Sequence, residues 1–349
     1  MSDLAARHAA VADDVEARVL AVLRSGAYIG GPWVAEVEAL VARWCGRAGA
    51  VGVNGGTDAL ILGLQALGVR PGDEVIVPAL SFFATAGAVC AIGAVPVIAD
   101  VLADDGCLDP DAAGNLITPG TRAIVPVHLF GALAAHPACD VPILDDAAQA
   151  IGADPPASTG ILTAISTYPT KTWGGAGDGG FVVGDDPELL SRIRLLGSHG
   201  AAGGHHHEPV AGAVGRNSRL DAIQAAVLLG HAPALADRVA RRRAIAAAYD
   251  AGLPPEIRAL RRSPGSPVHQ YVVRAPERDR LRHHLAARGI ETAVYYPKPL
   301  GDQPALRGRA RGDTPVARAL CGELLALPVH DGLADEDVAR VLEACSEAG

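Results

Sequence analysis

Several features that would place this chain in a specialised class of protein are missing from its sequence. It has no long basic tract, and its net charge of −9 argues against nucleic acid or an acidic membrane as a partner. Its six cysteines form no CxxC pair and no secretory leader is expected, so we predict reduced thiols in a cytoplasmic protein. The composition, 49% apolar and 20% charged, is that of an ordinary globular chain.

Charged residues are also absent from Val75 to Ala99, a stretch long enough to span a membrane. Two prolines and two glycines interrupt this stretch, however, and acidic residues flank it on both sides. We therefore predict a buried strand at 74–77, a helix at 85–92 and a second strand at 95–99, and no membrane segment.

Apolar segments of strand length alternate with segments of helical periodicity along most of the chain. This alternation predicts an α/β fold, with a large domain whose mainly parallel sheet is flanked by helices, and a smaller C-terminal α/β domain. We place the large domain at 1–235 and the small one at 236–349, because a proline-rich crossing follows a long predicted helix. Helices are expected at 1–25, 34–45, 57–67, 219–229, 235–249 and 278–288, and further strands at 51–53, 123–127, 141–144, 181–183, 271–273 and 292–296.

The segment around Lys171 carries the clearest chemical signal. Lys171 ends the segment Ser166-Thr-Tyr-Pro-Thr-Lys171 and precedes a glycine-rich stretch, and Asp146 lies a short way upstream. A lysine amine can form a Schiff base with the aldehyde of pyridoxal phosphate (PLP), and a carboxylate can keep the pyridine nitrogen protonated. Most lysines are solvated surface charges, so the prediction of a PLP site depends on the whole ordered set of residues.

The glycine-rich stretch contains a match to G-x-G-x-x-G, from Gly175 to Gly180. An apolar strand follows it instead of a helix, so the context of a dinucleotide-binding site is missing. The glycines are better explained as letting the chain turn tightly beside the lysine. A nicotinamide-dependent dehydrogenase is therefore the weakest of the functions considered.

A second candidate site element is Asn54-Gly-Gly-Thr57-Asp-Ala-Leu60, where a predicted strand ends and a helix begins. The first backbone amides of a helix, with the Thr57 hydroxyl, can bind a phosphate group. Thr57 could instead be a simple N-cap, which is the commoner role of an isolated Gly-Thr pair. Together with Lys171, the segment favours phosphate binding.

Three further candidates follow the ends of predicted strands, where α/β folds bind ligands. Phe82 could stack on a cofactor ring or belong to the core. Asp146 is either a ligand group or a solvated turn residue. Gln149 lies one helical turn after Asp146 and could brace that carboxylate or contact the phenol oxygen of the cofactor.

The motif His205-His-His207-Glu208 suggests a metal site, but adjacent histidines point in different directions and no second cluster is visible. We predict no metal and a polar loop near the mouth of the site. No G-x-S-x-G motif occurs, and no other serine, histidine or cysteine nucleophile motif was found.

Taken in order, these segments resemble the PLP-dependent sugar aminotransferases of the DegT/StrS type, which have the aspartate-aminotransferase fold (fold type I). The resemblance covers nearly the whole chain. Its most specific segments are Tyr168-Pro-Thr-Lys171 and Asn217-Ser-Arg-Leu-Asp221, and it includes Asp146-Ala-Ala-Gln149. Some members of the family have histidine in place of the lysine and act as dehydratases, and Lys171 argues against that activity.

The resemblance implies roles for the residues around the cofactor ring. Lys171 would form the Schiff base and shuttle the proton. Asp146 would pair with the pyridinium, Phe82 would stack on the ring, and Gln149 would lie near the ring oxygen.

The resemblance also implies which residues bind the phosphate. Gly56, Thr57 and Ser166 would hold the phosphate within one subunit. Asn217 would reach the phosphate of the neighbouring subunit, which implies a homodimer with shared active sites.

On the substrate side, the family usually has histidine where this chain has Tyr295 and Gly301. We expect an amino acid donor, glutamate by resemblance, and a keto sugar acceptor, a nucleotide-linked keto-deoxyhexose. An aminocyclitol aminotransferase acting on a keto-inositol is an alternative, because it needs no nucleotide pocket. A PLP-binding regulatory protein without turnover is a second alternative, and the presence of every expected catalytic residue argues against it.

Overall fold

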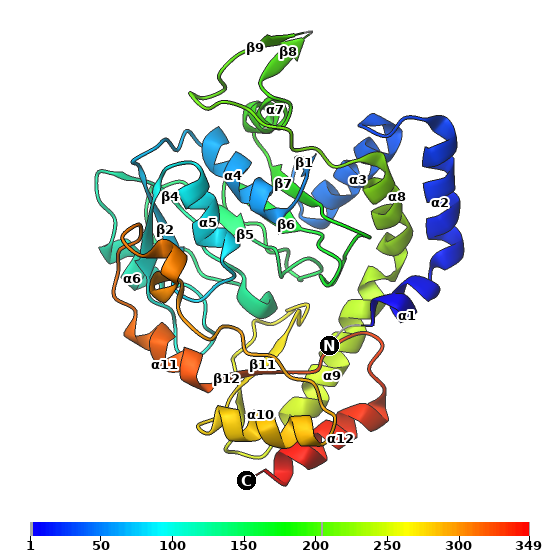
Figure 1. Cartoon of the computed structure of the whole chain (residues 1–349), viewed down its shortest axis with the longest axis vertical. Coiled ribbons are helices and arrows are strands. Elements are labelled where there is room, and N and C mark those ends of the chain that lie inside the picture. The colour runs from blue at the N-terminus through cyan, green and yellow to red at the C-terminus, as the bar shows by residue number, and fades with distance from the viewer. Residues whose placement is uncertain (1–2, 204, 349) are drawn as a thin grey trace.

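A mixed β-sheet lies at the centre of the larger part of the molecule (Figure 1). The structure is a computed structural model, and it describes residues 3–203 and 205–348. Three strands pair in parallel in the order β3-β2-β4, and four more follow the order β5-β6-β7-β1. These strands are β1 (Gly49–Val53), β2 (Glu74–Pro78), β3 (Val95–Ala99), β4 (Thr121–Ile124), β5 (Leu144–Asp146), β6 (Leu162–Ser166) and β7 (Gly180–Gly184).

The two sets of strands are joined by isolated parallel bridges, one of which pairs Val127 with Asp146. Pro126 and Pro142 lie at this junction and have no N–H to donate, so a regular ladder cannot form there. The strand predicted at 141–144 is therefore misplaced, because β5 begins only at the last residue of that range. β7 runs antiparallel to both of its neighbours, β1 and β6, whereas the other strand pairs of this sheet are parallel, and the prediction of a mainly parallel sheet is confirmed.

Helices cover both faces of this sheet, as predicted. Successive residues of β7 point to opposite faces, so Val182 packs in the core that includes α4 and α5, whereas Phe181 and Val183 pack in the core that includes α3 and α8. The side chain of Asp221 accepts a hydrogen bond from the Gln224 amide, which sets the start of α8 three residues later than expected. The four helices are α3 (Gly31–Trp44), α4 (Gly56–Ala66), α5 (Ala84–Ala91) and α8 (Ala222–His231).

The C-terminal part forms a second core around an antiparallel sheet of order β10-β11-β12. The strand predicted at 292–296 is wrong, because only an isolated bridge between Ala293 and Ala326 forms there, just before the N–H-lacking Pro297 and Pro299. The chain then returns to the large sheet, where the Leu300 amide donates to Ala79. The elements of this part are α9 (Leu235–Gly252), β10 (Arg258–Ala259), β11 (Tyr271–Arg274), α10 (Arg278–Ala287), α11 (Pro315–Glu323), β12 (Leu324–Leu327) and α12 (Asp335–Ser346).

The N-terminal segment forms two helices instead of the single one expected over 1–25, whose first two residues lie outside the described residues. The chain breaks between α1 (Leu4–Ala9) and α2 (Ala12–Ser25), and α1 turns toward the loop that carries Lys171 (Figure 1). No helix among the described residues has the length and apolarity that crossing a membrane requires. The remaining elements are α6 (Pro110–Asn115), α7 (Pro187–Leu196), the projecting pair β8 (Ala201–Gly203) and β9 (His206–His207), and short 3-10 turns at Leu129–Gly131, Ala232–Ala234, Leu300–Asp302 and Pro304–Leu306.

Candidate active site

Lys171 lies in the connection between β6 and β7, which we call the lysine loop (residues 167–179). Backbone hydrogen bonds close this loop, because Lys171 N donates to Tyr168 O at 2.8 Å and Gly175 N donates to Thr167 O at 2.8 Å. A Cβ at Gly174 would lie 2.3 Å from the carbonyl oxygen of Pro169, so only glycine fits there. The glycine run thus allows the backbone to fold closely on itself, and it leads into a strand as predicted.

Asp146 ends β5 and is buried at the carboxyl edge of the sheet. Its Oδ2 accepts a hydrogen bond of 2.9 Å from the hydroxyl of Thr85, which lies 2.8 Å from the hydroxyl of Ser81. Its Oδ1 accepts a hydrogen bond of 3.1 Å from the amide of Ala148. Thr85 and Ala148 therefore fix this carboxylate without neutralising its charge, and Ser81 supports Thr85.

Lys171 and Asp146 interact electrostatically across the site. Burial lowers the pKa of the Lys171 amine from 10.5 to about 8, and the negative charge of Asp146 partly opposes this change. Burial also raises the pKa of Asp146, against the hydrogen bonds from Ala148 and Thr85 and the positive charge of Lys171. The Lys171 amine thus loses its proton more easily than an ordinary lysine does, and the Asp146 carboxylate is stabilised in its charged form by a positive group nearby.

The neighbouring Asp145 serves a different purpose, because consecutive strand residues point to opposite faces of a sheet. Its carboxylate accepts bonds from the amides of Thr159 and Gly160 and lies 2.7 Å from Nε2 of His136. Burial alone would raise the pKa of Asp145, but interactions with His128 and His136 outweigh burial and hold it well below its usual range. Asp145 therefore anchors the loops beside β5, and only Asp146 faces the lysine.

The segments expected to hold a phosphate meet at the first turn of α4. Gly56 and Ser166 are in contact, since a Cβ at Gly56 would lie 2.7 Å from Cβ of Ser166. The N-cap of α4 is Gly55, which makes no side-chain cap hydrogen bond, so Thr57 is not an N-cap and lies in the first turn of the helix. The first turn of α4 is thus a helix N-terminus without a side-chain cap, the arrangement that binds phosphate in other proteins.

Gln149 is buried and has two partners. Its Oε1 accepts a hydrogen bond of 2.5 Å from the amide of Phe130, and its Nε2 donates to the hydroxyl of Tyr296 at 3.4 Å. The structure gives Gln149 these bonds instead of one to Asp146, which Thr85 and Ala148 brace. Gln149 therefore does not brace Asp146, and contact with the phenol oxygen of the cofactor stays as its predicted role.

Phe82 and Asn217 are not buried in the single chain. The side chain of Phe82 is 60% exposed, so it is not a core residue and one of its faces is free to stack. Asn217 is also exposed, although its neighbour Ser218 is buried and accepts a hydrogen bond from the Asn54 amide beside α4. Both residues are placed where a further group, from a ligand or from another chain, can reach them.

The histidine-rich loop carries no metal site within the described residues. His206 and Glu208 pair with each other at 2.9 Å, and Nδ1 of His207 lies 3.1 Å from the carbonyl oxygen of His199. This loop projects from the body of the molecule around β8 and β9, away from the lysine loop (Figure 1).

Sequence reasoning missed three polar partners of the site: Thr85, Tyr296 and Arg7. Thr85 had a usable signal, because it follows Ser81 by four residues at the start of a helix just past a strand end. Tyr296 and Arg7 had none, since their partners lie 147 and 164 residues away in the chain.

The fold, with the Lys171 amine and the Asp146 carboxylate buried at the edge of its sheet, is that of the class of PLP-dependent transferases of fold type I. The profile of the DegT/DnrJ/EryC1/StrS aminotransferase family matches residues 10–346, and the chain belongs to this family. The predictions of family, aminotransferase activity and PLP as cofactor are confirmed.

Individual relatives match over nearly their whole length. The chain is 41% identical to dTDP-3-amino-3,4,6-trideoxy-alpha-D-glucose transaminase of Streptomyces venezuelae, over 99% of this chain and 94% of the relative. The crystal structure of S. venezuelae DesV in complex with a ketimine intermediate has a TM-score of 0.92 and 40% identity, covering 99% of this chain and 97% of that one. The PLP-form of the putative sugar aminotransferase Spr1654 from Streptococcus pneumoniae has a TM-score of 0.85 and 26% identity, covering 97% of each chain.

The residues present in this chain fit the cofactor. The absence of a side chain at Gly56 leaves open the space in front of Ser166, where a Cβ would collide. Burial raises the pKa of Asp146, so a positively charged group such as a protonated ring nitrogen would stabilise its carboxylate. Lys171 completes the set with an amine of lowered pKa.

Proposed function

We propose that this enzyme transfers an amino group from an amino acid, glutamate, to a nucleotide-linked keto-deoxyhexose in amino-sugar biosynthesis. The observation that carries the proposal is the placement of the Lys171 amine, with a pKa of about 8, opposite the buried carboxylate of Asp146 in a chain of this family. The S. venezuelae relative is itself named as a transaminase of a dTDP-linked trideoxy sugar, which supports this class of acceptor.

In the proposed reaction Lys171 is the group that carries the proton. An amine with a pKa of about 8 is neutral in about a tenth of the molecules at pH 7, compared with about one in three thousand for an ordinary lysine. Bound PLP would supply an electron sink for the carbanion of the substrate. Asp146 would hold a proton on the ring nitrogen, while Thr85 and Ala148 keep its carboxylate in position.

The proposed phosphate contacts and the stacking contact hold the cofactor still during this proton transfer. Gly56, Thr57 and Ser166 would bind the phosphate at the first turn of α4, where the helix dipole favours a negative charge. Phe82 would cover one face of the ring. Gln149, fixed by Phe130 and Tyr296, would lie near the ring oxygen.

A small cavity beside the lysine loop is the proposed binding place for the reacting end of the substrate. It has a volume of about 220 Å³ and is lined by Thr170, His269, Gln270 and Tyr295, among others. This volume is below the roughly 300–1,000 Å³ of clefts that enclose drug-sized ligands, so it suits a sugar ring or an amino acid and leaves a nucleotide outside. An aminocyclitol would also fit, and comparing turnover of a nucleotide-linked keto sugar with that of a keto-inositol decides between them.

We also propose a homodimer in which Asn217 completes the neighbouring site. Exposed aromatic side chains belong to the site segments in the single chain, Phe82 at 60% exposure and Tyr168 of the lysine loop at 52%, and Val214, three residues before Asn217, is 82% exposed. Co-expression of Lys171→Ala with Asn217→Leu chains tests the arrangement. If Asn217 acts across the interface, mixed dimers contain one intact site and recover activity, whereas action within one chain leaves both sites defective and no activity returns.

The absorbance spectrum of the PLP-loaded protein tests the proposed transamination directly. Adding glutamate is expected to convert the visible band of bound PLP to the near-ultraviolet band of pyridoxamine phosphate and to release 2-oxoglutarate. Lys171→Ala is expected to lose this conversion, and Lys298→Ala, the same change at the only other lysine of the chain, is expected to keep it. A wild-type band that ignores glutamate and other amino acids would instead support the regulatory alternative.

Two predictions from the sequence stay proposals. We propose that the protein works in the cytoplasm, which the six unpaired cysteines within the described residues support. We keep the division into domains at 1–235 and 236–349, which the core around α10 and α12 supports. Residues 300–321 lie in the second range but pack in the core of the large sheet.

A further inference from the structure

Arg7 of α1 joins the N-terminal helix to the backbone of the catalytic lysine. Its Nη1 donates a hydrogen bond of 2.9 Å to the carbonyl oxygen of Lys171 and a longer one of 3.4 Å to that of Pro169. Its Nη2 and Nε donate to the two carboxylate oxygens of Asp331, at 2.8 and 3.4 Å. The planar guanidinium thus links three separate segments of the chain, which a single-point ammonium group could not do.

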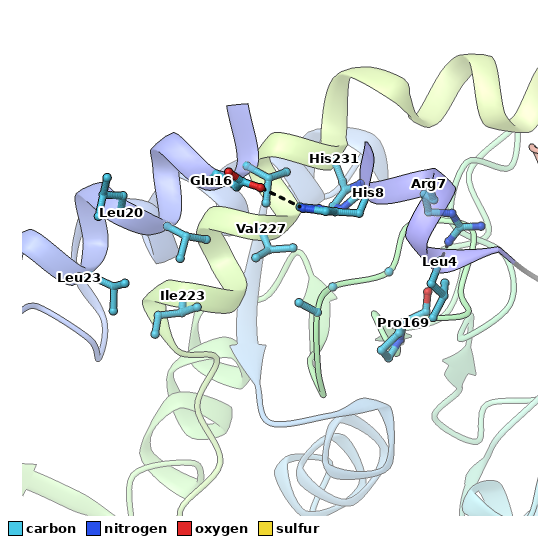
Figure 2. Close-up of a pocket in the computed structure, with 15 residues that line it drawn as sticks. Leu4, Arg7, His8, Glu16, Leu20, Leu23, Pro169, Ile223, Val227 and His231 are labelled. Atoms are coloured by element: carbon cyan, nitrogen blue, oxygen red, sulfur yellow. Dashed lines mark hydrogen bonds and ion pairs between the residues drawn. The ribbon is translucent and has the colours of Figure 1, made fainter. Parts of the chain in front are cut away.

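The lysine loop needs this link because it lacks packing on the side that faces α1. A cavity of about 740 Å³ lies beside the contact where α2 packs on α8, and residues of α1, α2, α8 and the lysine loop line it, among them Pro169 and the residues 174–176. Figure 2 shows Arg7 and Leu4 on α1 close to Pro169, at one end of this cavity. At the other end of the loop, Gln224 accepts a hydrogen bond from the Ala176 amide. The bond donated by Arg7 and the bond accepted by Gln224 therefore hold the loop where it borders the cavity, while Trp173 anchors its middle in the core and donates to the carbonyl oxygen of Leu228.

Asp331 keeps Arg7 in place and connects it with the C-terminal part. Three buried arginines converge on this one carboxylate, because Nε of Arg238 lies 3.7 Å and Nη2 of Arg242 lies 3.6 Å from its oxygens. Arg242 also donates to the carbonyl oxygens of His269 and Val329, which line the small cavity beside Thr170. Arg238 instead bonds to His231 at 2.8 Å, and none of its bonds within the described residues goes to the lysine loop.

We propose that Arg7 is a positioning residue for Lys171, which holds the lysine loop so that the amine stays in its buried place opposite Asp146. The inference rests on the proposed catalytic role of Lys171. If Arg7 is lost, the loop relaxes toward the cavity, water reaches the amine, and the pKa of Lys171 rises from about 8 toward its ordinary 10.5. Losing the charge of Arg7 is not what would raise the pKa of Lys171, because burial and the charge of Asp146 are the causes of its shift.

The titratable groups that interact with the Lys171 amine are Asp146 of β5 and His269 of the segment before β11, and no variant in the comparison changes either of them. Arg242 and Asp331 belong to the cluster behind Arg7 and are also unchanged. Arg7→Met removes the hydrogen bonds and the charge, and Arg7→Lys keeps the charge but cannot make the same set of bonds. Arg238→Met is the matched control, because it removes an equally buried charge from the same carboxylate without touching the loop.

The pKa of Lys171 can be measured directly because the chain has only two lysines, Lys171 and Lys298. Reductive ¹³C-methylation of the cofactor-free protein gives two lysine signals, which Lys298→Arg assigns, and each is followed by NMR as the pH is raised. In Arg7→Lys the third lysine signal is identified by its absence from the wild type. We expect Arg7→Met and Arg7→Lys to raise the pKa of Lys171 by about one unit or more, and Arg238→Met to leave it unchanged. The pH dependence of the visible band of the PLP-loaded variants is a second readout.

Each alternative result overturns the proposal in a different way. Equal shifts in Arg7→Met and Arg238→Met would mean that lost charge or stability is responsible, and a wild-type pKa in Arg7→Lys would mean that the bond geometry does not matter. A wild-type Lys171 that titrates near 10.5, or no shift in either Arg7 variant, would also exclude a positioning role. Because the NMR titration needs neither PLP nor substrate, a failure of glutamate to react would contradict the proposed function and leave this inference standing.

Discussion

Thr85 donates a hydrogen bond of 2.9 Å to Oδ2 of Asp146, from the first turn of α5 to the end of β5. The bond is buried and its acceptor is a carboxylate, so it belongs to the stronger kind of protein hydrogen bond. Together with the Ala148 amide, which donates to Oδ1, it holds both oxygens of the Asp146 carboxylate. The site is therefore shaped as much by α5, which follows Phe82, as by the lysine loop.

Replacing Thr85 by valine is expected to weaken PLP binding by about tenfold or more. Valine has the shape of threonine but no hydroxyl, and a hydrogen bond to a charged group contributes about 1.5–3 kcal/mol. Without it the pKa of Asp146 rises further, and less carboxylate is available for the ring nitrogen. Titration of the cofactor-free protein with PLP, followed by absorbance, measures the change. Thr85→Ser keeps the hydroxyl and is expected to bind PLP nearly as the wild type does; equal losses in both variants would contradict the role of the bond.

A methyl group at Gly56 is expected to weaken PLP binding. The added Cβ would lie 2.7 Å from Cβ of Ser166, inside the cradle proposed for the phosphate. Overpacking of this kind costs about 1–3 kcal/mol, which corresponds to a loss of affinity of about fivefold to 150-fold. Gly55→Ala is the control, because no heavy atom lies within 4 Å of its added Cβ and the backbone there is extended, with φ 179°. Similar PLP affinity of the two variants would remove Gly56 from the cradle.

Asp146→Asn is expected to lower the pKa of Lys171 below about 8 in the cofactor-free protein. The negative charge of Asp146 raises this pKa, and the neutral amide removes that effect while burial remains. NMR titration of the ¹³C-methylated lysines measures it. A rise in the pKa of Lys171 would mean that the two residues do not interact as the structure shows.

Lys171 makes the stability of the cofactor-free protein depend on pH in a defined direction. The folded state has the lower pKa, about 8 against 10.5, so between these values the unfolded state binds more protons and stability rises with pH. Lowering the pKa of Lys171 from 10.5 to about 8 on folding destabilises the folded protein by about 3 kcal/mol below pH 8. This destabilisation disappears above pH 10.5, where the amine is neutral in both states.

Urea unfolding of the wild type and of Lys171→Met at several pH values checks this expectation. The methionine side chain of the variant cannot titrate, so the difference in unfolding free energy between the two proteins is expected to shrink as the pH rises from about 8 to 10.5. Cysteines and tyrosines titrate in the same range but are common to both proteins and cancel. A difference that stays constant with pH would contradict the lowered pKa of Lys171.

Segments with a strong local pattern were predicted well from the sequence. The strand predicted at 95–99 has the expected bounds, and the helix predicted from residue 235 begins there. Both were predictable because apolar runs and helical periodicity reflect burial directly. The strands at 141–144 and 292–296 were misplaced or absent for a local reason, since nearby prolines remove the N–H groups that pairing needs. The glycine run leads into a strand, as predicted, so the helix that follows such a motif in a dinucleotide-binding site is missing.

By itself, the sequence determined the α/β alternation, the lysine in its glycine-rich loop and the carboxylate that follows a strand, because each depends on residues close together in the chain. Only the tertiary structure decided how these parts hold one another. The bond from Thr85 to Asp146 joins residues 61 positions apart, and the bond from Arg7 to Lys171 joins residues 164 positions apart. Such contacts depend on strand order and on the place where α1 packs, which no local pattern specifies. The burial that lowers the pKa of Lys171 arises in the same way, from segments that meet only in the folded chain.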